Sequence, residues 1–385
     1  MKKQILRVTM CLCITFLLML GQTPALCIEP IQEDTFDLPV KSAVLMDYNT
    51  GTVIYKKNET EALSPASVTK IMTLLLVMEE IEKGNLGYDD NVSVSEYAAS
   101  MGGSQVFLEA GESIKVEDLI KSIIVASGND AAVAMAETVA GSESEFIKRM
   151  NEKAAELGMT STKFYNSTGL DDTEYNLTSA LDIALMSRAL MRHEKIFDYS
   201  TIWMDSIRDG AFGLTNTNRL IRFYSGATGL KTGSTSKAGF CISATAKRDD
   251  LHLIAVIMGA ENRDVRNECA KKLLDFGFAN YSVYKNDGGI VHDINVKCGI
   301  DSKINGIYNG CEILCKKCVE NNITVNIDCP SELNAPIAKN DVIGKAIFTV
   351  DGNFIYTSPI VAEVNIRKIS YFEVLFRMFK RSLLK

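Results

Sequence analysis

Residues 64–83 read SPASVTKIMTLLLVMEEIEK, and their apolar spacing predicts a helix that Ser67 opens. Gly84, a common helix terminator, follows directly. Lys70 comes three residues after Ser67, so both side chains should share one helix face, about one turn apart. A serine hydroxyl is a weak nucleophile, but an amine whose pKa is lowered by burial or by a nearby cation can accept its proton. Ser67 and Lys70 are therefore a candidate catalytic pair.

A serine followed three residues later by a lysine does not by itself identify the nucleophile. The spacing occurs at Ser67-Lys70, Ser234-Lys237, Ser282-Lys285 and Ser382-Lys385. Two further elements occur once each and in order: Ser127-Gly128-Asn129 follows a helical stretch, and Lys231-Thr232-Gly233 leads into a predicted strand pair. Such a trio, with Asp at the middle of the second element, marks class A β-lactamases and penicillin-binding proteins. Gly128 replaces that Asp here, and the conjunction selects Ser67.

The segments around these elements predict an α/β unit with a largely antiparallel sheet and a helical block. Residues 42–55 indicate two strands around an Asn49-Thr50-Gly51 turn. Ser179 lies three residues before Asp182, as in a capping box. The predicted helices cover 116–126, 144–157, 179–192 and 264–278, and the predicted strand pair covers 240–246 and 251–259.

Beyond about residue 282 the helical periodicity fades and short alternating runs predict a small all-β domain. These runs are 294–296, 323–327 and 345–350, and Asp351-Gly352 indicates a hairpin turn. The tail 367–385 then has large apolar residues at spacings of three and four, with basic residues mostly between them. The apolar residues are Ile369, Phe372, Phe376, Phe379 and Leu383, and the basic ones are Arg377, Lys380, Arg381 and Lys385. Such a helix suits an anionic membrane surface, and the alternative is a helix packed on its own protein.

The N-terminus predicts export. Lys2, Lys3 and Arg7 precede an uncharged apolar run that is too short to span a membrane, and small residues follow near Ala25. We therefore expect a signal peptide over residues 1–27. A net charge of −7 and the absence of a basic run within the body of the chain argue against a nucleic-acid partner.

Cysteine and histidine give no strong signal for a metal or a catalytic triad. The run Cys311-x3-Cys315-x2-Cys318 resembles some metal cradles, but ordinary reduced or paired thiols are the preferred interpretation, and no metal or cofactor is expected. The pairing of Cys298, Cys311, Cys315, Cys318 and Cys329 cannot be read from the sequence. The three histidines, His193, His252 and His292, do not neighbour a nucleophile signature and are interpreted as structural or exposed.

Four segments together resemble the D-alanyl-D-alanine carboxypeptidases, which are low-molecular-mass penicillin-binding proteins. They are SPASVTKIMT (64–73), ASMGGSQVFLEAGE (99–112), ASGNDAAVAMAE (126–137) and GLKTGSTSKAGFC (229–241). The resemblance is closest to the form found in spore-forming Gram-positive bacteria. It implies the penicillin-binding transpeptidase fold, a second, sandwich-like β domain and a basic C-terminal helix. The implied organisation is a signal peptide (1–27), a catalytic domain (28–281), a β domain (282–366) and a membrane-anchoring helix (367–385).

The resemblance also implies a role for each site residue. Ser67 forms the acyl-enzyme, Lys70 accepts its proton and Ser127 relays a proton to the leaving D-alanine. Asn129 holds the peptide amide of the substrate, while the cation of Lys231 beside the hydroxyl of Thr232 meets its terminal carboxylate. Gly233 leaves room for a substrate along the strand, and the backbone N–H groups of Ser67 and Ser234 face the oxyanion.

The expected substrate is the peptidoglycan stem peptide ending in D-Ala-D-Ala, and β-lactam antibiotics are expected covalent ligands. An exported enzyme at the outer face of the cell membrane or in the cell wall fits this substrate. Two alternatives stay open at the level of sequence. A β-lactamase would need a base that positions water, for which Glu174 is the one tempting candidate, and a non-catalytic peptidoglycan sensor would have kept the fold alone.

Overall fold

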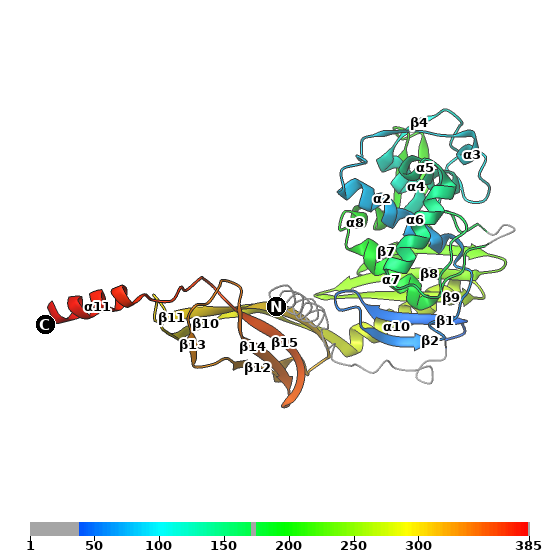
Figure 1. Cartoon of the computed structure of the whole chain (residues 1–385). Coiled ribbons are helices and arrows are strands. Elements are labelled where there is room, and N and C mark those ends of the chain that lie inside the picture. The colour runs from blue at the N-terminus through cyan, green and yellow to red at the C-terminus, as the bar shows by residue number, and fades with distance from the viewer. Residues whose placement is uncertain (1–37, 171–174, 384–385) are drawn as a thin grey trace, which may run out of the picture. The chain divides into compact units, whose positions relative to one another are not determined.

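The computed structural model describes residues 38–170 and 175–383, and the chain divides into two compact units between Tyr281 and Ser282 (Figure 1). The predicted signal peptide and Glu174 lie outside the described residues.

A five-stranded antiparallel sheet forms the centre of the first unit, in the order β2-β1-β9-β8-β7 within the described chain. The predicted 42–55 hairpin is confirmed, because Asp47 accepts hydrogen bonds from the backbone N–H and the hydroxyl of Thr50 and so closes the turn. The strands are β1 (Ser42–Asp47), β2 (Val53–Lys57), β7 (Ala227–Thr235), β8 (Gly239–Arg248) and β9 (Leu251–Ala260). Strand β7 is one of the two edge strands of this sheet over the described residues.

Helices cover both faces of the sheet, which is why β9 is buried at nearly every position. On one face, a Cβ at Gly277 of helix α10 would touch Leu253 and Leu45, so α10 packs directly on β9 and β1. On the other face, Val44 and Val256 join the core of the helical block. Lys231 on β7 lies opposite Ser243 on β8, and the Ser243 hydroxyl is hydrogen-bonded to the hydroxyl of Ser187 in the helical block. Lys231 therefore lies on the sheet face that the helical block covers.

Figure 1 shows the helical block beside the sheet. At the start of helix α7, the Ser179 hydroxyl accepts a hydrogen bond from the backbone N–H of Asp182, which confirms the predicted cap. The helices of this unit are α2 (Lys70–Glu82), α3 (Glu96–Ala99), α4 (Val116–Ile124), α5 (Asn129–Ala140), α6 (Glu143–Glu156), α7 (Ala180–Met191), α8 (Ile196–Ser200), α9 (Leu220–Phe223) and α10 (Arg263–Asn280). Two small two-stranded sheets, which the sequence did not reveal, also belong to this unit: β3 (Asn91–Ser93) with β4 (Ser113–Lys115), and β5 (Met204–Ile207) with β6 (Phe212–Thr215).

The second unit is the predicted all-β domain, with a sheet in the order β12-β14-β15-β11-β10-β13 over its described residues. Asp351 and Gly352 both adopt positive φ and form the tight turn between β14 and β15. Its own apolar core includes Phe348, Ile355 and Ile360. The strands are β10 (Tyr281–Lys297), β11 (Lys303–Lys316), β12 (Ile323–Asp328), β13 (Glu332–Asn334), β14 (Val342–Val350) and β15 (Asn353–Ala362).

Helix α11 (Tyr371–Leu383) forms the C-terminal tail and exposes a row of aromatic side chains. Phe372, Phe376 and Phe379 are 81%, 71% and 69% exposed. Among the described residues, no helix has the length and apolar character needed to cross a membrane. Within the described chain, Cys298, Cys311, Cys315, Cys318 and Cys329 are not joined by disulfide bonds.

Candidate active site

Ser67 lies on a short 3-10 turn (η2, Ala66–Thr69) that precedes helix α2, so the predicted α-helical start at Ser67 is wrong by one turn. Ala66, directly before it, has a φ of 49°, a strained value for a residue with a Cβ. A tight backbone contact surrounds this turn, because a Cβ on Gly169 would come within 1.8 Å of the Ala66 carbonyl oxygen. Close packing therefore fixes the position of the Ser67 hydroxyl.

Lys70 is fully buried and its Nζ lies 3.0 Å from the Ser67 hydroxyl oxygen. Nζ also donates to the Asn129 Oδ1 at 2.6 Å and to the Thr168 carbonyl at 2.7 Å. A neutral amine has two N–H groups and one lone pair. When Asn129 and Thr168 accept the two N–H groups, the lone pair faces Ser67, which is the arrangement that a base for this hydroxyl requires.

The surroundings of Lys70 favour the neutral amine. Burial, and after it the charge of Lys231, hold the pKa of Lys70 well below its usual range, although Asp130 opposes the shift. A lowered pKa increases the fraction of neutral amine, so Lys70 is better suited to accept a proton than an ordinary surface lysine.

Ser127 and Lys231 form the second pair of the site, with the Lys231 Nζ donating to the Ser127 hydroxyl at 2.9 Å. Ser127 has a φ of 66°, another strained backbone value for a residue with a Cβ. Burial, and after it the charge of Arg266, lower the pKa of Lys231 to about 7. Ser127 therefore lies beside an amine that can be charged or neutral near physiological pH.

Asn129 begins helix α5 and connects the Lys70 amine with the neighbouring loop. Its Nδ2 donates to the Gly102 carbonyl at 2.7 Å, and its backbone N–H donates to the Ser104 carbonyl. The next residue, Asp130, is buried and accepts the backbone N–H groups of Val106 and Leu108 in the same loop. Asn129 and Asp130 thus hold the loop beside the Ser127 turn.

Lys231, Thr232 and Gly233 lie within strand β7, which precedes the two strands of the predicted pair, β8 and β9. Gly233 lies against the η2 turn that carries Ser67: a Cβ on Gly233 would lie 2.7 Å from the Pro65 carbonyl oxygen and 2.8 Å from the Ser67 nitrogen. The missing side chain therefore allows β7 to approach the backbone of Ser67. Ser234, the next residue, is exposed.

The three other serines that are followed three residues later by a lysine do not share the surroundings of Ser67 and Lys70. The Lys237 Nζ lies over the Tyr175 ring, and Lys285 pairs with Glu312. Ser282 donates to Glu320. The side chain of Ser382 and the whole of Lys385 are outside the described residues.

The histidines have structural or exposed positions, as predicted. The His193 Nδ1 lies 2.7 Å from a Glu82 oxygen, and His252 meets the Thr228 hydroxyl at 2.9 Å. His292 is exposed.

Three residues around the site were not anticipated from the sequence. Thr168 contributes only a backbone carbonyl, which carries no residue-type signature. The Thr217 hydroxyl lies 2.8 Å from that of Thr232. Arg266, 3% exposed on α10, acts electrostatically on Lys231. An isolated Thr or Arg in a helix-and-strand pattern gives no signal of such long-range contacts.

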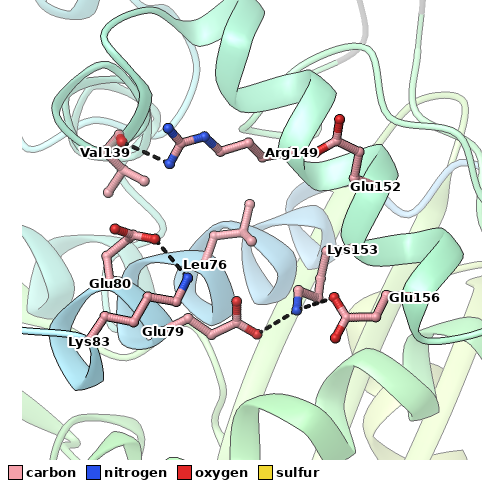
Figure 2. Close-up of a pocket in the computed structure, with 9 residues that line it drawn as sticks. All are labelled: Leu76, Glu79, Glu80, Lys83, Val139, Arg149, Glu152, Lys153 and Glu156. Atoms are coloured by element: carbon pink, nitrogen blue, oxygen red, sulfur yellow. Dashed lines mark hydrogen bonds and ion pairs between the residues drawn. The ribbon is translucent and has the colours of Figure 1, made fainter. Parts of the chain in front are cut away.

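A cavity of about 340 Å³ lies at the far end of α2, where α2 approaches α5 and α6 (Figure 2). Five of its charged side chains form ion pairs: Lys153 bridges Glu79 and Glu156, and Lys83 pairs with Glu80. Glu79 is nine residues from Lys70, about 14 Å along a helix. This cavity is therefore separate from the cluster around Ser67.

Comparison with known proteins gives two family matches. A family model described as D-alanyl-D-alanine carboxypeptidase matches residues 29–262, and one described as the C-terminal domain of penicillin-binding protein 5 matches residues 278–368. The chain is 43% identical over 345 residues to D-alanyl-D-alanine carboxypeptidase DacF of Bacillus subtilis, covering 88% of each chain. It is 32% identical to DacC of Escherichia coli over 355 residues, again covering 88% of each.

Solved structures show the same similarity. Penicillin-binding protein 5 of Haemophilus influenzae superposes with a TM-score of 0.76 at 28% identity, covering 86% of this chain and 99% of that one. Penicillin-binding protein D2 of Listeria monocytogenes, solved with ampicillin bound, gives a TM-score of 0.56 at 29% identity, covering 63% of this chain and 98% of that one. The predicted fold class, a penicillin-binding transpeptidase unit followed by an all-β domain, is confirmed.

Proposed function

The chain belongs to the D-alanyl-D-alanine carboxypeptidase family of serine peptidases, and we propose that Ser67 is the nucleophile with which it removes the terminal D-alanine. The activity itself follows from the family. The observation that supports Ser67 is the buried Lys70 amine at 3.0 Å, with its two other hydrogen bonds directed to Asn129 and Thr168.

In the proposed acylation, Lys70 takes the proton of Ser67 while the Ser67 oxygen attacks the carbonyl carbon of the penultimate D-alanine. The Ser67 backbone N–H and, as a second donor, that of Ser234 stabilise the oxyanion. When the carbon–nitrogen bond breaks, Ser127 relays to the leaving amine the proton that Lys70 took from Ser67, so Lys70 is neutral again. Water then hydrolyses the ester, which releases the shortened peptide and regenerates the hydroxyl of Ser67.

Substrate recognition is proposed to use the other polar groups of the site. Lys231 and Thr232 bind the terminal carboxylate, since a cation beside a hydroxyl is suited to it. The Asn129 Nδ2 donates one hydrogen to Gly102, and its second hydrogen is proposed to meet the amide carbonyl of the substrate. The substrate lies along the β7 edge at Gly233. A β-lactam carries an amide and a carboxylate in a similar arrangement, so it acylates the same serine.

The test is release of D-alanine from a peptide ending in D-Ala-D-Ala by the purified protein and by Ser67→Ala. We expect turnover and a covalent adduct with labelled penicillin for the natural protein and neither for the variant. Ser282→Ala, which alters another serine followed by a lysine three residues on, is the matched control and should keep full activity. A penicillin adduct on Ser67→Ala would refute the assignment.

The location of the enzyme is also part of the proposal. Members of this family act outside the cytoplasm, on the cell wall. We propose that residues 1–27 direct export, that residues 28–281 are the catalytic domain and 282–366 the β domain, and that residues 367–385 hold the enzyme on the membrane surface. The exposed aromatic row of α11 supports the last of these assignments.

A further inference from the structure

The turn between β6 and α9 has a regular alternation of burial around Thr217. Asn216 and Asn218 are 5% and 1% exposed, whereas Thr217 between them is exposed. The Asn216 Nδ2 donates to the Ile202 carbonyl at 2.7 Å, and the Asn218 Nδ2 donates to the Gly229 carbonyl at 2.8 Å. Buried amides with their hydrogen bonds satisfied fix a backbone firmly. Thr217 is therefore presented from a rigid turn.

The same turn is hydrogen-bonded to the two segments that lead to Ser127 and to Lys231. The backbone N–H of Thr217 donates to the Val125 carbonyl, two residues before Ser127. The carbonyl that accepts from Asn218 belongs to Gly229, two residues before Lys231. Thr217 therefore has a fixed distance to both elements that the substrate must contact.

The Thr217 side chain reaches Thr232 directly, since the Thr232 hydroxyl donates to the Thr217 oxygen at 2.8 Å. A hydroxyl that donates its only proton to a neighbour cannot donate it to a ligand. When a carboxylate arrives, Thr232 must turn its proton toward the carboxylate. The Thr217 hydroxyl can then reverse its role and donate to the Thr232 oxygen, which leaves every polar group satisfied.

We propose that Thr217 is a positioning residue for the terminal carboxylate of the substrate, acting through the hydroxyl of Thr232. The proposal rests on the assignment of Lys231 and Thr232 as the carboxylate receptor. Donation from Thr217 orients Thr232 and makes its O–H a stronger donor, because hydrogen bonds in a chain polarise one another. The effect is specific for ligands with a free carboxylate.

The decisive variant is Thr217→Val, which keeps the shape of the side chain and removes its hydroxyl. For a peptide ending in D-Ala-D-Ala we expect KM to rise about 3- to 10-fold with kcat nearly unchanged, the range for one neutral hydrogen bond of about 0.5–1.5 kcal/mol. Thr217→Ser, which keeps a hydroxyl, should restore KM. Thr215→Val, an exposed threonine two residues away, is the matched control and should leave both constants unchanged.

A second measurement separates a role in carboxylate recognition from a merely structural one. Acylation by a penicillin should slow in Thr217→Val by the same factor, whereas acylation by the methyl ester of that penicillin should not change. Equal losses for acid and ester, a loss confined to kcat, or no rescue by Thr217→Ser would each overturn the proposal. Failure of the unaltered enzyme to release D-alanine would instead refute the assigned function, so the two failures are distinguishable.

Discussion

Two buried lysines set opposite requirements on pH at the scale of single residues. In the proposed mechanism, Lys70 must be neutral to accept the proton of Ser67, and Lys231 must be charged to attract a carboxylate. The charge of Lys231 lowers the pKa of Lys70 and the charge of Arg266 lowers that of Lys231, in each case after the larger effect of burial. Arg266 therefore affects the ionisation of Lys231, and Lys231 in turn affects that of Lys70. The dependence of activity on pH reports both effects.

Arg266→Met should move the alkaline limb of the pH profile. Activity falls on the alkaline side as Lys231 loses its proton, with a pKa of about 7. Removing the positive charge of Arg266 stabilises protonated Lys231, so its pKa rises and the limb shifts to higher pH. Measurement of kcat/KM against pH, which reports the free enzyme, gives this limb.

Arg266→Lys keeps the charge and is the matched control, with a limb close to that of the natural enzyme. The height of the profile can fall in both variants without affecting the interpretation. An alkaline limb that stays in place, or moves to lower pH, in Arg266→Met would show that Arg266 does not control the ionisation of Lys231.

Gly233→Ala should inactivate the enzyme without unfolding it. The new methyl group would lie 2.7–2.8 Å from backbone atoms of Pro65 and Ser67, which cannot rotate away. Strand β7, which carries Ser234, must then move away from the turn that carries Ser67, so the two proposed oxyanion donors separate. Loss of one such donor costs about 100- to 1000-fold in rate. The measurement is the acylation rate with labelled penicillin, together with the thermal unfolding midpoint.

Gly213→Ala is the control for Gly233, because a Cβ at Gly213 meets nothing within 4 Å. It should acylate at the natural rate. Natural acylation by Gly233→Ala would mean that the close approach of β7 to Ser67 is not required.

A site residue could be predicted from the sequence only where its side chain, rather than its backbone, takes part in the site. Ser67, Lys70, Ser127 and Lys231 stand in short motifs, so their clustering in space could be anticipated. Thr168 takes part only through a backbone carbonyl, for which any residue type would serve. Its contribution comes from tertiary packing and could not be read from the chain.

At the scale of elements, the strongly periodic segments were predicted well, whereas β7 and α5 were not. Helix α7 has both a cap and a periodic apolar face, and its predicted range, 179–192, lies within one residue of Ala180–Met191. Strand β7 contains Gly229 and Gly233, which are usually unfavourable in strands. Both are required by close backbone or side-chain contacts that only the folded structure creates.

Lys153→Met should destabilise the helical block and leave catalysis unchanged. Lys153 joins α2 to α6 by contacting Glu79 and Glu156, and its side chain is 14% exposed (Figure 2). Methionine keeps the apolar stem but leaves Glu79 without this cation. We expect the free energy of unfolding to fall by about 1 kcal/mol, the upper range for partly exposed pairs. Urea denaturation measures this change.

Lys148→Met is the matched control on the same helix, since its pair with Glu145 is exposed and confined to α6. It should change the unfolding free energy by less than about 0.5 kcal/mol. An equal effect of the two variants would mean that the α2–α6 contact contributes no more than a surface pair. Reduced acylation in Lys153→Met would show that the far end of α2 influences Lys70.

At the scale of the whole molecule, the catalytic unit and the α11 tail should be separable in function. The hydrogen bonds described for the Ser67 cluster are made by residues of the first unit. Replacing Phe372, Phe376 and Phe379 by serine should therefore preserve turnover of a soluble peptide. The same variant should release the enzyme from lipid vesicles, because each buried phenylalanine contributes about 1.5–3 kcal/mol.

A second variant tests whether charge adds to this attachment. Arg377→Gln with Lys380→Gln should weaken binding to anionic vesicles, by about tenfold or more, because each cation near such a surface contributes about 1 kcal/mol. Binding of the natural protein should weaken with added salt, whereas that of the charge variant should depend less on salt. Sedimentation with vesicles of neutral or anionic lipid measures both effects.

If the phenylalanine variant still sediments with anionic vesicles as the natural protein does, α11 is not the anchor. Equal binding of the natural protein to neutral and anionic vesicles would show that attachment relies on the aromatic face alone.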